Sequence, residues 1–433
     1  MSGQIERQPV LPRLADILRR PVSRGDRDRA RRHLLDWTAC AIAARQETVA
    51  TALRQGTDQS TEGCAFVWGG LGNVLEMDDV DKRALLHPGP TIIPAVLALA
   101  RDVDSTTDEI LDAIVVGYDA TIRLGRAVGA GHYALWHNTG TCGPIGAAAA
   151  CGTLLRLDHN AMTNALALAM SQSSGLWQTR HEPHSMGKQL HTAHAARAGL
   201  HAARLAAAGM HGPRTILEGA QGFFAASCEG AQAENVLNDY PGWLIHDVSF
   251  KPWPACRHAH AAIDAALVAR TRGLSGDHIC VSTYRDALQF CDRPYPSSMI
   301  EAKFSLQHAV AVAFVRGEPQ LSDFEQHSIN DAQIRAVRET VAVTADDALD
   351  VAYPAHFGAR LDINGQSITV SDALGDPENP LSDEALISKA RMLMEAGGCT
   401  PEFTERMIGA CLRSEASDGE HRLLYEAIGD TLP

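Results

Sequence analysis

Residues 187–208 read GKQLHTAHAARAGLHAARLAAA, and this stretch decides the fold class of the sequence. Alanine has the highest intrinsic helix propensity, so the stretch predicts one long helix. Residues without a bulky side chain, such as Ala195 and Gly199, let another backbone come close. We therefore expect this helix to pack tightly against other helices.

The same small-residue character extends back to residue 146, and apolar residues recur at helical spacing in both directions along the chain. We predict two helices within 13–44 and further helices at 91–100, 108–128, 143–155 and 160–171. Residues 67–87 are rich in Gly and Asp and are interpreted as a loop. The first 248 residues therefore predict an all-helical domain.

The pattern changes near Val248, where short segments of strand character appear. Strands are predicted at 279–284 and 337–343 and a hairpin at 359–370, where Asn364-Gly365 suits a tight turn. Helices return at 383–396 and 400–412. We predict a mainly α protein, whose large all-helical domain (1–248 and 381–433) carries an inserted, smaller α+β lid domain (249–380). A cleft between domains is a common place for a small-molecule site.

Composition limits the classes of partner. The 433 residues carry a formal net charge of −14, which argues against nucleic acid and against an anionic membrane surface. No apolar run reaches the roughly 20 residues that cross a bilayer, and the first residues lack the apolar core of a signal peptide. The expected compartment is the cytoplasm. The ten cysteines show no CxxC pair, so we expect neither structural zinc nor a disulfide framework.

Four segments gather titratable side chains around Gly and Pro. They are EMDDVD at 76–81 with HPG at 87–89, HYALWHNTG at 132–140, RHEPHSMGKQLH at 180–191, and FKPWPACRHAH at 250–260. Each has a structural alternative, because an acidic run is usually a solvated loop and a single His is usually a hydrogen-bonded structural residue. Lys188 and His191, however, share one face at a helix start, where free N–H groups also attract anions.

A metal site is an alternative for the last segment, because Cys256, His258 and His260 alternate along it. Its neighbours Lys251 and Arg257 are cationic, and positive charge repels a metal ion while it attracts a carboxylate. We therefore predict a site for a small anionic carboxylate, with no metal ion and no organic cofactor.

The four segments, in this order and spacing, resemble the MmgE/PrpD family. The motifs that carry the resemblance are LEMDDV at 75–80, HPG at 87–89, His137, MGKQLH at 186–191, KPWPACRH at 251–258 and FSLQH at 304–308. The resemblance implies a homodimer, a helical domain with an α+β lid, and no cofactor. Activities known in the family include 2-methylcitrate dehydratase, cis-aconitate decarboxylase and iminodisuccinate epimerase.

In the decarboxylase-like members, the resemblance places site residues at the positions of Glu76, Val80, His87, His137, Lys188, Lys251 and Phe290. Three positions depart from that pattern, because aspartate has become Glu76, threonine Val80, and tyrosine Phe290. Two hydroxyl groups are lost by these changes. His132, Arg180 or His184 are the candidates to replace them as proton donors.

Removing a proton α to a carboxylate builds negative charge that fixed cations stabilise, and imidazole moves protons near neutral pH. The predicted catalytic residues are therefore His87, His137, Lys188 and Lys251. The predicted substrate-binding residues are Glu76, Asp79, Arg180, His184, His191, Arg257, His258 and Phe290.

Epimerisation needs only a base on one face and an acid on the other, so it loses least by the missing hydroxyls. The first choice is an epimerase of an imino- or amino-dicarboxylate such as iminodisuccinate. The alternative is a lyase, either a hydro-lyase of the 2-methylcitrate dehydratase kind or a decarboxylase of the cis-aconitate kind. A non-catalytic, anion-binding paralogue is a third hypothesis.

Overall fold

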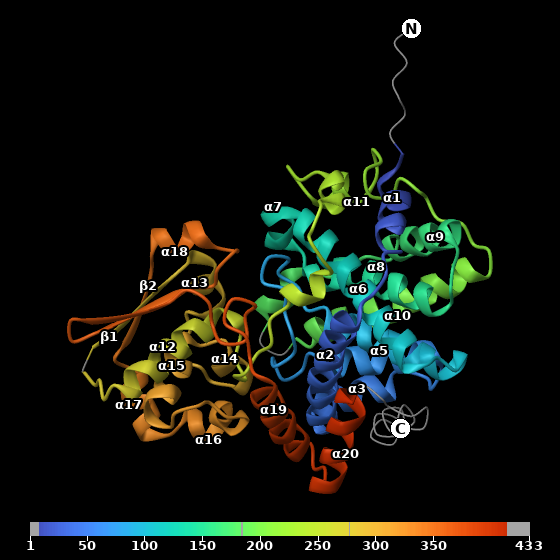
Figure 1. Cartoon of the computed structure of the whole chain (residues 1–433). Coiled ribbons are helices and arrows are strands. Elements are labelled where there is room, and N and C mark those ends of the chain that lie inside the picture. Colours follow the sequence, from blue (N-terminus) through green and yellow to red (C-terminus); the bar gives the residue numbers. More distant parts are fainter. Residues whose placement is uncertain (1–7, 183–184, 277, 414–433) are drawn as a thin grey trace. The chain divides into compact units, whose positions relative to one another are not determined.

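The computed structural model describes residues 8–182, 185–276 and 278–413, and Figure 1 shows its helices and strands. The chain divides into two compact units. The first, which we call the body, comprises residues 1–248 and 386–433, and the second unit comprises residues 249–385. The predicted mainly α fold with a small mixed sheet is confirmed.

The described part of the body is helical. Its α-helices are α1 (Val10–Ile17), α2 (Arg24–Ala43), α3 (Thr48–Gln55), α4 (Thr61–Leu71), α5 (Gly89–Val103), α6 (Thr107–Ala127), α7 (Gly129–Leu135), α8 (Asn138–Leu154), α9 (His159–Met170), α10 (Gly187–Ala207), α11 (Phe223–Ser227) and α20 (Pro401–Leu412). Helix α19 (Asp383–Ala396) begins at the end of the second unit and continues into the body. Short 3₁₀ helices lie at Ala44–Gln46, Trp177–His181, Ala233–Leu237 and Leu244–Asp247.

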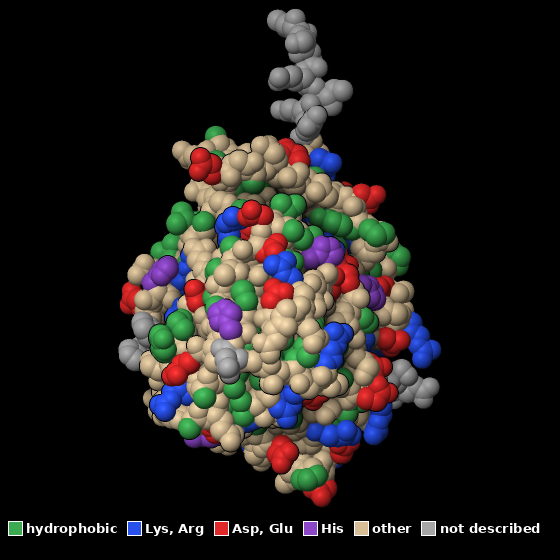
Figure 2. Space-filling model, turned by 90° about the vertical axis from the view of Figure 1, so that its left-hand side faces the viewer, with side chains coloured by type: hydrophobic (Ala, Val, Ile, Leu, Met, Phe, Trp, Pro, Cys, Tyr) green, Lys and Arg blue, Asp and Glu red, His purple; other side chains and the backbone are tan. Residues whose placement is uncertain are grey.

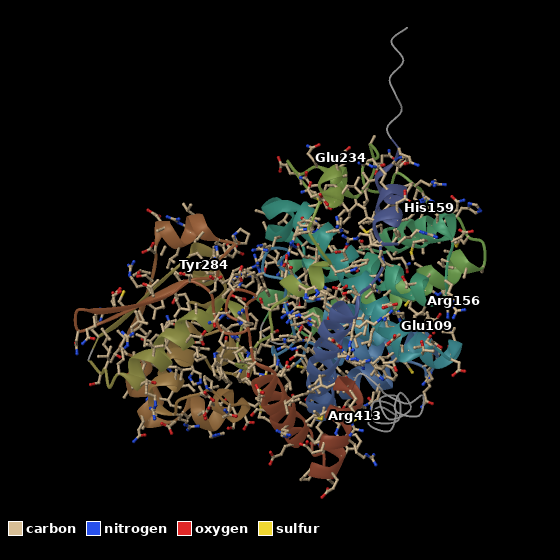
Figure 3. All side chains as sticks on the ribbon, viewed as in Figure 1. Glu109, Arg156, His159, Glu234, Tyr284 and Arg413 are labelled. Carbon is tan, nitrogen blue, oxygen red and sulfur yellow. The ribbon has the colours of Figure 1, made fainter. Side chains whose placement is uncertain are left out.

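Local sequence explains where the two longest of the early helices begin. Ser23 precedes α2 and forms a capping box with Asp26, and Thr106 precedes α6 and forms one with Glu109. Each pair satisfies backbone N–H groups that the helix itself leaves without partners. Glu109 also pairs with Arg156 at 2.5 Å, so the start of α6 contacts the chain just after α8; both side chains are labelled in Figure 3.

Helix α10 is the fold-deciding stretch of the sequence, and it packs against α4, α5, α8 and α9. Gly199 shows why small residues are needed there. A Cβ atom at Gly199 would lie 2.4 Å from the Cβ of Ala147 and 2.5 Å from the carbonyl oxygen of Pro144, both on α8. Such distances are far below van der Waals contact, so the two helix backbones lie as close as the sequence predicts.

The second unit contains a four-stranded sheet with helices packed on it. Its strands are β1 (Ile279–Thr283), β2 (Val341–Ala345), β3 (Ala359–Ile363) and β4 (Gln366–Val370), in the order β2-β1-β3-β4. Strands β1 and β2 are parallel, and the other pairs are antiparallel. Its α-helices are α12 (His260–Thr271), α13 (Arg285–Cys291), α14 (Met299–Lys303), α15 (Leu306–Val315), α16 (Gln326–Ile329), α17 (Ala332–Arg338) and α18 (Asp347–Ala352), and 3₁₀ helices lie at Arg257–Ala259 and Leu321–Phe324. Helix α12 packs on β3 and β4, and α15 on β2 (Figure 1).

The predicted hairpin is confirmed, with Asn364 (φ 49°) and Gly365 (φ 78°) at its turn. The predicted strand at 337–343 is partly wrong, because Val337 and Arg338 end helix α17 and the strand begins at Val341. Val337 packs against the apolar cluster of Ala311, Val312 and Ile334. Tertiary packing therefore outweighs the strand preference of this β-branched residue.

Within the described residues, no helix is both long and apolar enough to cross a membrane. The face drawn in Figure 2 has positive and negative side chains interspersed, without a large block of either sign. That surface does not have the basic stripe that a nucleic-acid backbone requires.

Candidate active site

Glu76 and Lys188 form an ion pair in the body. Glu76 lies in the loop between α4 and α5 with a left-handed backbone (φ 59°), a conformation that costs a non-glycine residue about 1 kcal/mol. Lys188 is the second residue of α10, and only 17% of its side chain is exposed, against 2% for Glu76. A cation at a helix N-terminus, among backbone N–H groups, suits a carboxylate ligand.

His87 is oriented by the same loop. Its Nδ1 atom lies 2.9 Å from Oδ2 of Asp78 and 3.0 Å from the carbonyl oxygen of Asp79. Because a carbonyl oxygen only accepts, Nδ1 carries hydrogen and donates. The other ring nitrogen, Nε2, is therefore the one that exchanges a proton. A charged His87 ring has Asp78 beside it as a counterion.

Asp79 is used inside the protein rather than by a substrate. It is buried, and it accepts hydrogen bonds from Nδ1 of His33 (2.7 Å), the hydroxyl of Tyr118 (2.7 Å) and the backbone N–H of Gly89 (2.9 Å). Burial raises its pKa to about 6. These contacts hold the acidic loop against α2, α5 and α6, and they engage the oxygens of Asp79 that the sequence predicts to bind substrate.

His137 and His191 form a pair of imidazoles, with their Nδ1 atoms 3.2 Å apart. His137 directly precedes α8, is buried, and packs on the ring of Trp177 at a centroid distance of 4.4 Å. Burial, then the charges of His191, Lys188 and His87, hold its pKa well below the usual value. Burial and His194 lower the pKa of His191 to about 4. Both rings are therefore neutral near pH 7 and able to accept a proton.

His191 contacts His137 and follows Lys188 by three residues on α10, and the backbone N–H of His87 donates to Thr139, two residues after His137, so these groups share one neighbourhood of the body. Sequence reasoning did not single out three residues of this neighbourhood, namely Asp78, Trp177 and Thr139. The hydroxyl of Thr139 accepts from the backbone N–H of His87 at 3.0 Å. Asp78 belongs to the EMDDVD segment, which shortly precedes HPG in the sequence, and this closeness could have indicated a contact with His87. No motif in the sequence pointed to Trp177.

The candidates for replacement proton donors have different outcomes. His132 is buried, and its nitrogens contact the carbonyl oxygen of Ser227 (2.9 Å) and the hydroxyl of Thr141 (2.8 Å). Both ring nitrogens are thus occupied by the protein, which argues against His132 as a donor to substrate. Arg180 lies over the ring of Trp177 at 5.5 Å, and so adjoins the His137 cluster. His184 lies outside the described residues.

In the second unit, Lys251 is completely buried, and the neighbouring Arg257 has a structural role. Arg257 donates to Asp376 at 2.5 Å and to the carbonyl oxygen of Leu374 at 3.0 Å, and its Nη1 lies 3.1 Å from Nδ1 of His260. These contacts engage the guanidinium of Arg257, which the sequence predicts to bind substrate, in holding one turn of its own unit.

His258 and Phe290 stack at a centroid distance of 4.9 Å, with Phe357 at 5.2 Å from the same imidazole. Nδ1 of His258 lies 2.6 Å from the hydroxyl of Tyr284, which Figure 3 labels. Nε2 of His260 lies 3.1 Å from the carbonyl oxygen of Ala255. Among the described residues, Cys256, His258 and His260 do not form a group with metal-ligand spacing.

Fold and geometry together define a mainly helical protein whose body contains a histidine–carboxylate pair, a pair of imidazoles and a lysine–carboxylate pair. The chain belongs to the MmgE/PrpD family. The MmgE/PrpD N-terminal domain matches residues 20–235, and the MmgE/PrpD C-terminal domain matches residues 253–413.

Similar proteins include three cis-aconitate decarboxylases. The mouse enzyme is 28% identical over 64% of this chain and 59% of its own length, and the human enzyme is 29% identical over 64% and 60%. The enzyme of Aspergillus terreus is 26% identical over 76% of this chain and 73% of its own. The matched regions thus span about three fifths of the two mammalian relatives.

Proposed function

We propose that this protein is a lyase that decarboxylates a small unsaturated tricarboxylate of the cis-aconitate type without an organic cofactor. The observation that carries the proposal is the Glu76–Lys188 pair beside His87 and His137, which unites a carboxylate-binding cation with two proton carriers. The similarity to cis-aconitate decarboxylases supports the same reaction class.

The chemistry requires one cation and one proton donor at the reacting carbon. The C–C bond to a carboxylate breaks, carbon dioxide leaves, and the remaining electron pair takes up one proton. Lys188 neutralises a retained carboxylate and stabilises the charge that builds up. His87, with Asp78 as counterion, delivers the proton from Nε2, and the neutral His137 accepts a proton or hydrogen-bonds the substrate.

Lys251 is proposed to contribute a second cation to the same reaction, as the MmgE/PrpD resemblance implies. Its complete burial is consistent with a role other than a surface charge. We also propose that the active protein is a homodimer, which light scattering after gel filtration would test.

The test is turnover of cis-aconitate in deuterated water, followed by NMR. The proposal expects an alkene product that lacks one carboxylate and carries one solvent deuteron. A panel with 2-methylcitrate and iminodisuccinate distinguishes the alternatives, because a dehydratase forms an alkene without losing carbon, and an epimerase exchanges the α-proton without net product. Silence across the panel would support the anion-binding paralogue.

The epimerase is kept as the second candidate on one observation, the apolar side chains of Val80 and Phe290. Both are wholly or partly buried, and neither supplies a hydroxyl proton. In a two-base epimerase, His87→Ala or His137→Ala abolishes epimerisation, yet one enantiomer still exchanges its α-proton with solvent. Equal loss of exchange from both enantiomers in both variants would contradict the two-base scheme.

A further inference from the structure

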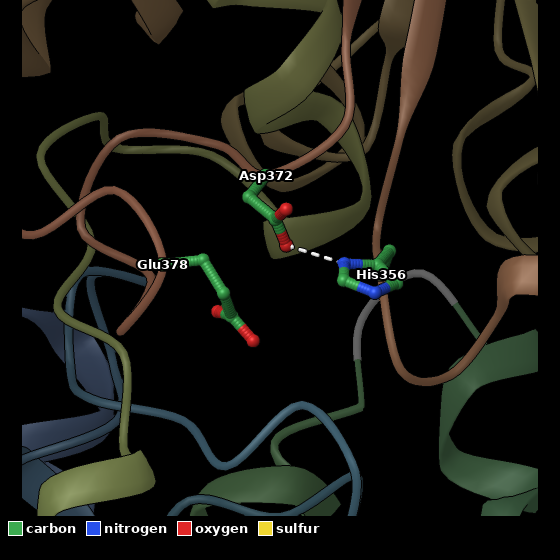
Figure 4. A group of neighbouring side chains, drawn as sticks. All are labelled: His356, Asp372 and Glu378. Carbon is green, nitrogen blue, oxygen red and sulfur yellow. Dashed lines mark hydrogen bonds and ion pairs between the residues drawn. The ribbon is translucent and has the colours of Figure 1, made fainter.

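A second group of potential ligands lies in the second unit, formed by His356, Asp372 and Glu378 (Figure 4). One ligand atom from each residue lies within 4.8 Å of the other two. Nδ1 of His356 is 2.8 Å from Oδ1 of Asp372, and the exposed Glu378 side chain extends toward the same space. None of the three belongs to the proposed catalytic set.

Sheet pairing explains why these residues meet. Ala359 at the start of β3 pairs with Val370 at the end of β4. His356 precedes β3 by three residues and Asp372 follows β4 by two, so both lie at the same end of this strand pair. The turn after Asp372 brings Glu378 back close to both residues.

The turn that carries Asp372 and Glu378 is anchored at several points. The side-chain amide of Asn379 donates to the carbonyl oxygen of Asp372 at 3.2 Å. The backbone N–H of Gly375 donates to the carbonyl oxygen of Asn379 at 2.8 Å. Gly375 has φ 95°, and a Cβ atom there would lie 2.0 Å from the carbonyl oxygen of Phe250. The buried Asp376 accepts from Ser249 and Arg257, each at 2.5 Å. The ligand atoms thus stand on a rigid frame, as a binding site requires.

We infer that His356, Asp372 and Glu378 form a binding site for a divalent transition-metal cation of the Zn²⁺ class. Imidazole nitrogen and carboxylate oxygen are both zinc ligands, and a site with three protein ligands leaves a fourth position open to water. The imidazole disfavours Mg²⁺ and Ca²⁺, which take oxygen ligands. Zinc ligands lie about 2.0–2.2 Å from the ion, so metal binding requires the three ligand atoms to draw closer together than they are in this structure.

The test uses the full-length protein after chelation and gel filtration. Isothermal titration with Zn²⁺, and the visible absorption of Co²⁺, report on the site directly. The proposal expects one equivalent to bind and the Tm to rise by about 2 °C or more at saturating metal. His356→Gln, Asp372→Asn and Glu378→Gln should each weaken binding at least about 10-fold, since even changes beside a ligand cost this much.

His327→Gln is the matched control, because His327 is also a half-exposed imidazole beside a carboxylate, Glu325, at 3.6 Å. It should bind metal as the unmodified protein does. Equal affinity in all four variants would overturn the proposal and place the ion elsewhere, and absence of binding would also overturn it. Because the site lies outside the catalytic set, chelation should leave turnover unchanged. This separates failure of the metal site from failure of the proposed function.

Discussion

The body holds two histidine pairs of opposite character. His87 is paired with a carboxylate, since Asp78 lies 2.9 Å from its Nδ1 atom. His137 is paired with another imidazole, His191, and packs on the indole of Trp177. The first arrangement supplies a counterion for a charged ring, whereas the second disfavours charge on either ring. Two chemically identical side chains thus have different partners.

This difference indicates how one site manages a proton without an organic cofactor. The ring of His87 has a counterion whenever it is protonated, whereas burial disfavours a proton on His137, which suits hydrogen bonding to the substrate in the neutral form. The assignment rests on the partners Asp78 and His191 rather than on the histidines themselves. Substitutions of the partners therefore test whether the two pairs differ, and substitutions of the histidines test whether either ring takes part in catalysis.

The largest effect is expected from the histidines. His87→Ala and His137→Ala should each lower kcat/KM by about 10²–10⁴, the usual contribution of a positioned acid or base. The measurement is steady-state turnover of the substrate that the NMR panel identifies. His201→Ala is the control, since this half-exposed histidine of α10 should leave turnover unchanged. Full activity in either active-site variant would remove that histidine from the mechanism.

Lys188→Ala should lower kcat/KM by about 10²–10³, as for loss of one preorganised charge-stabilising donor. Two explanations compete, because Lys188 either stabilises the substrate or merely neutralises Glu76. A cycle with Glu76→Gln separates them. If Lys188 serves only Glu76, the double variant should recover most of the activity, whereas a substrate-binding Lys188 predicts no recovery.

Asp78→Asn should have a smaller effect, about 10- to 100-fold on kcat/KM, because one hydrogen bond to a charged ring is weakened while the carbonyl oxygen of Asp79 still orients it. His191→Asn should lower kcat/KM less than Asp78→Asn does, since no counterion is lost. The pH dependence of kcat/KM should change in Asp78→Asn, and Asp78→Glu should restore part of the activity. Equal losses from both partners would contradict the contrast between the pairs.

The smallest effect concerns stability in acid. The pKa of His191 is about 4 in the folded protein and near 6.5 when unfolded, so between these values only the unfolded chain binds the proton. The free energy of unfolding therefore falls as pH decreases through this window. Asp36 and Asp79 act in the opposite sense, because burial raises their pKa to about 6 and the folded state takes up protons first.

His191→Asn should accordingly show a smaller fall in Tm between pH 6.5 and 4.5 than the unmodified protein. A single titrating group changes the free energy of unfolding by at most about 1.4 kcal/mol per pH unit. Thermal unfolding by circular dichroism across this range measures it, with His201→Asn as the control. If Tm falls with pH by the same amount in His191→Asn and in the unmodified protein, the pKa of His191 is not lowered in the folded state.

Much of the fold followed from the sequence because its signals were local. Alanine-rich periodicity predicted α10, and Asn364-Gly365 predicted the hairpin. The site was harder to predict, since residue types identify candidates but not their partners. Asp79 and Arg257 belong to suitable motifs, yet the fold uses Asp79 to hold His33 and Tyr118 and uses Arg257 to hold Asp376. Those contacts join residues far apart in the sequence, which no single motif reveals.

The ion pair between Glu76 and Lys188 has a consequence for ligand recognition. Without substrate, the cation is already occupied by a carboxylate of its own chain. Under the proposed function, an incoming carboxylate competes with the Glu76 carboxylate for Lys188, and its affinity measures an exchange between two anions.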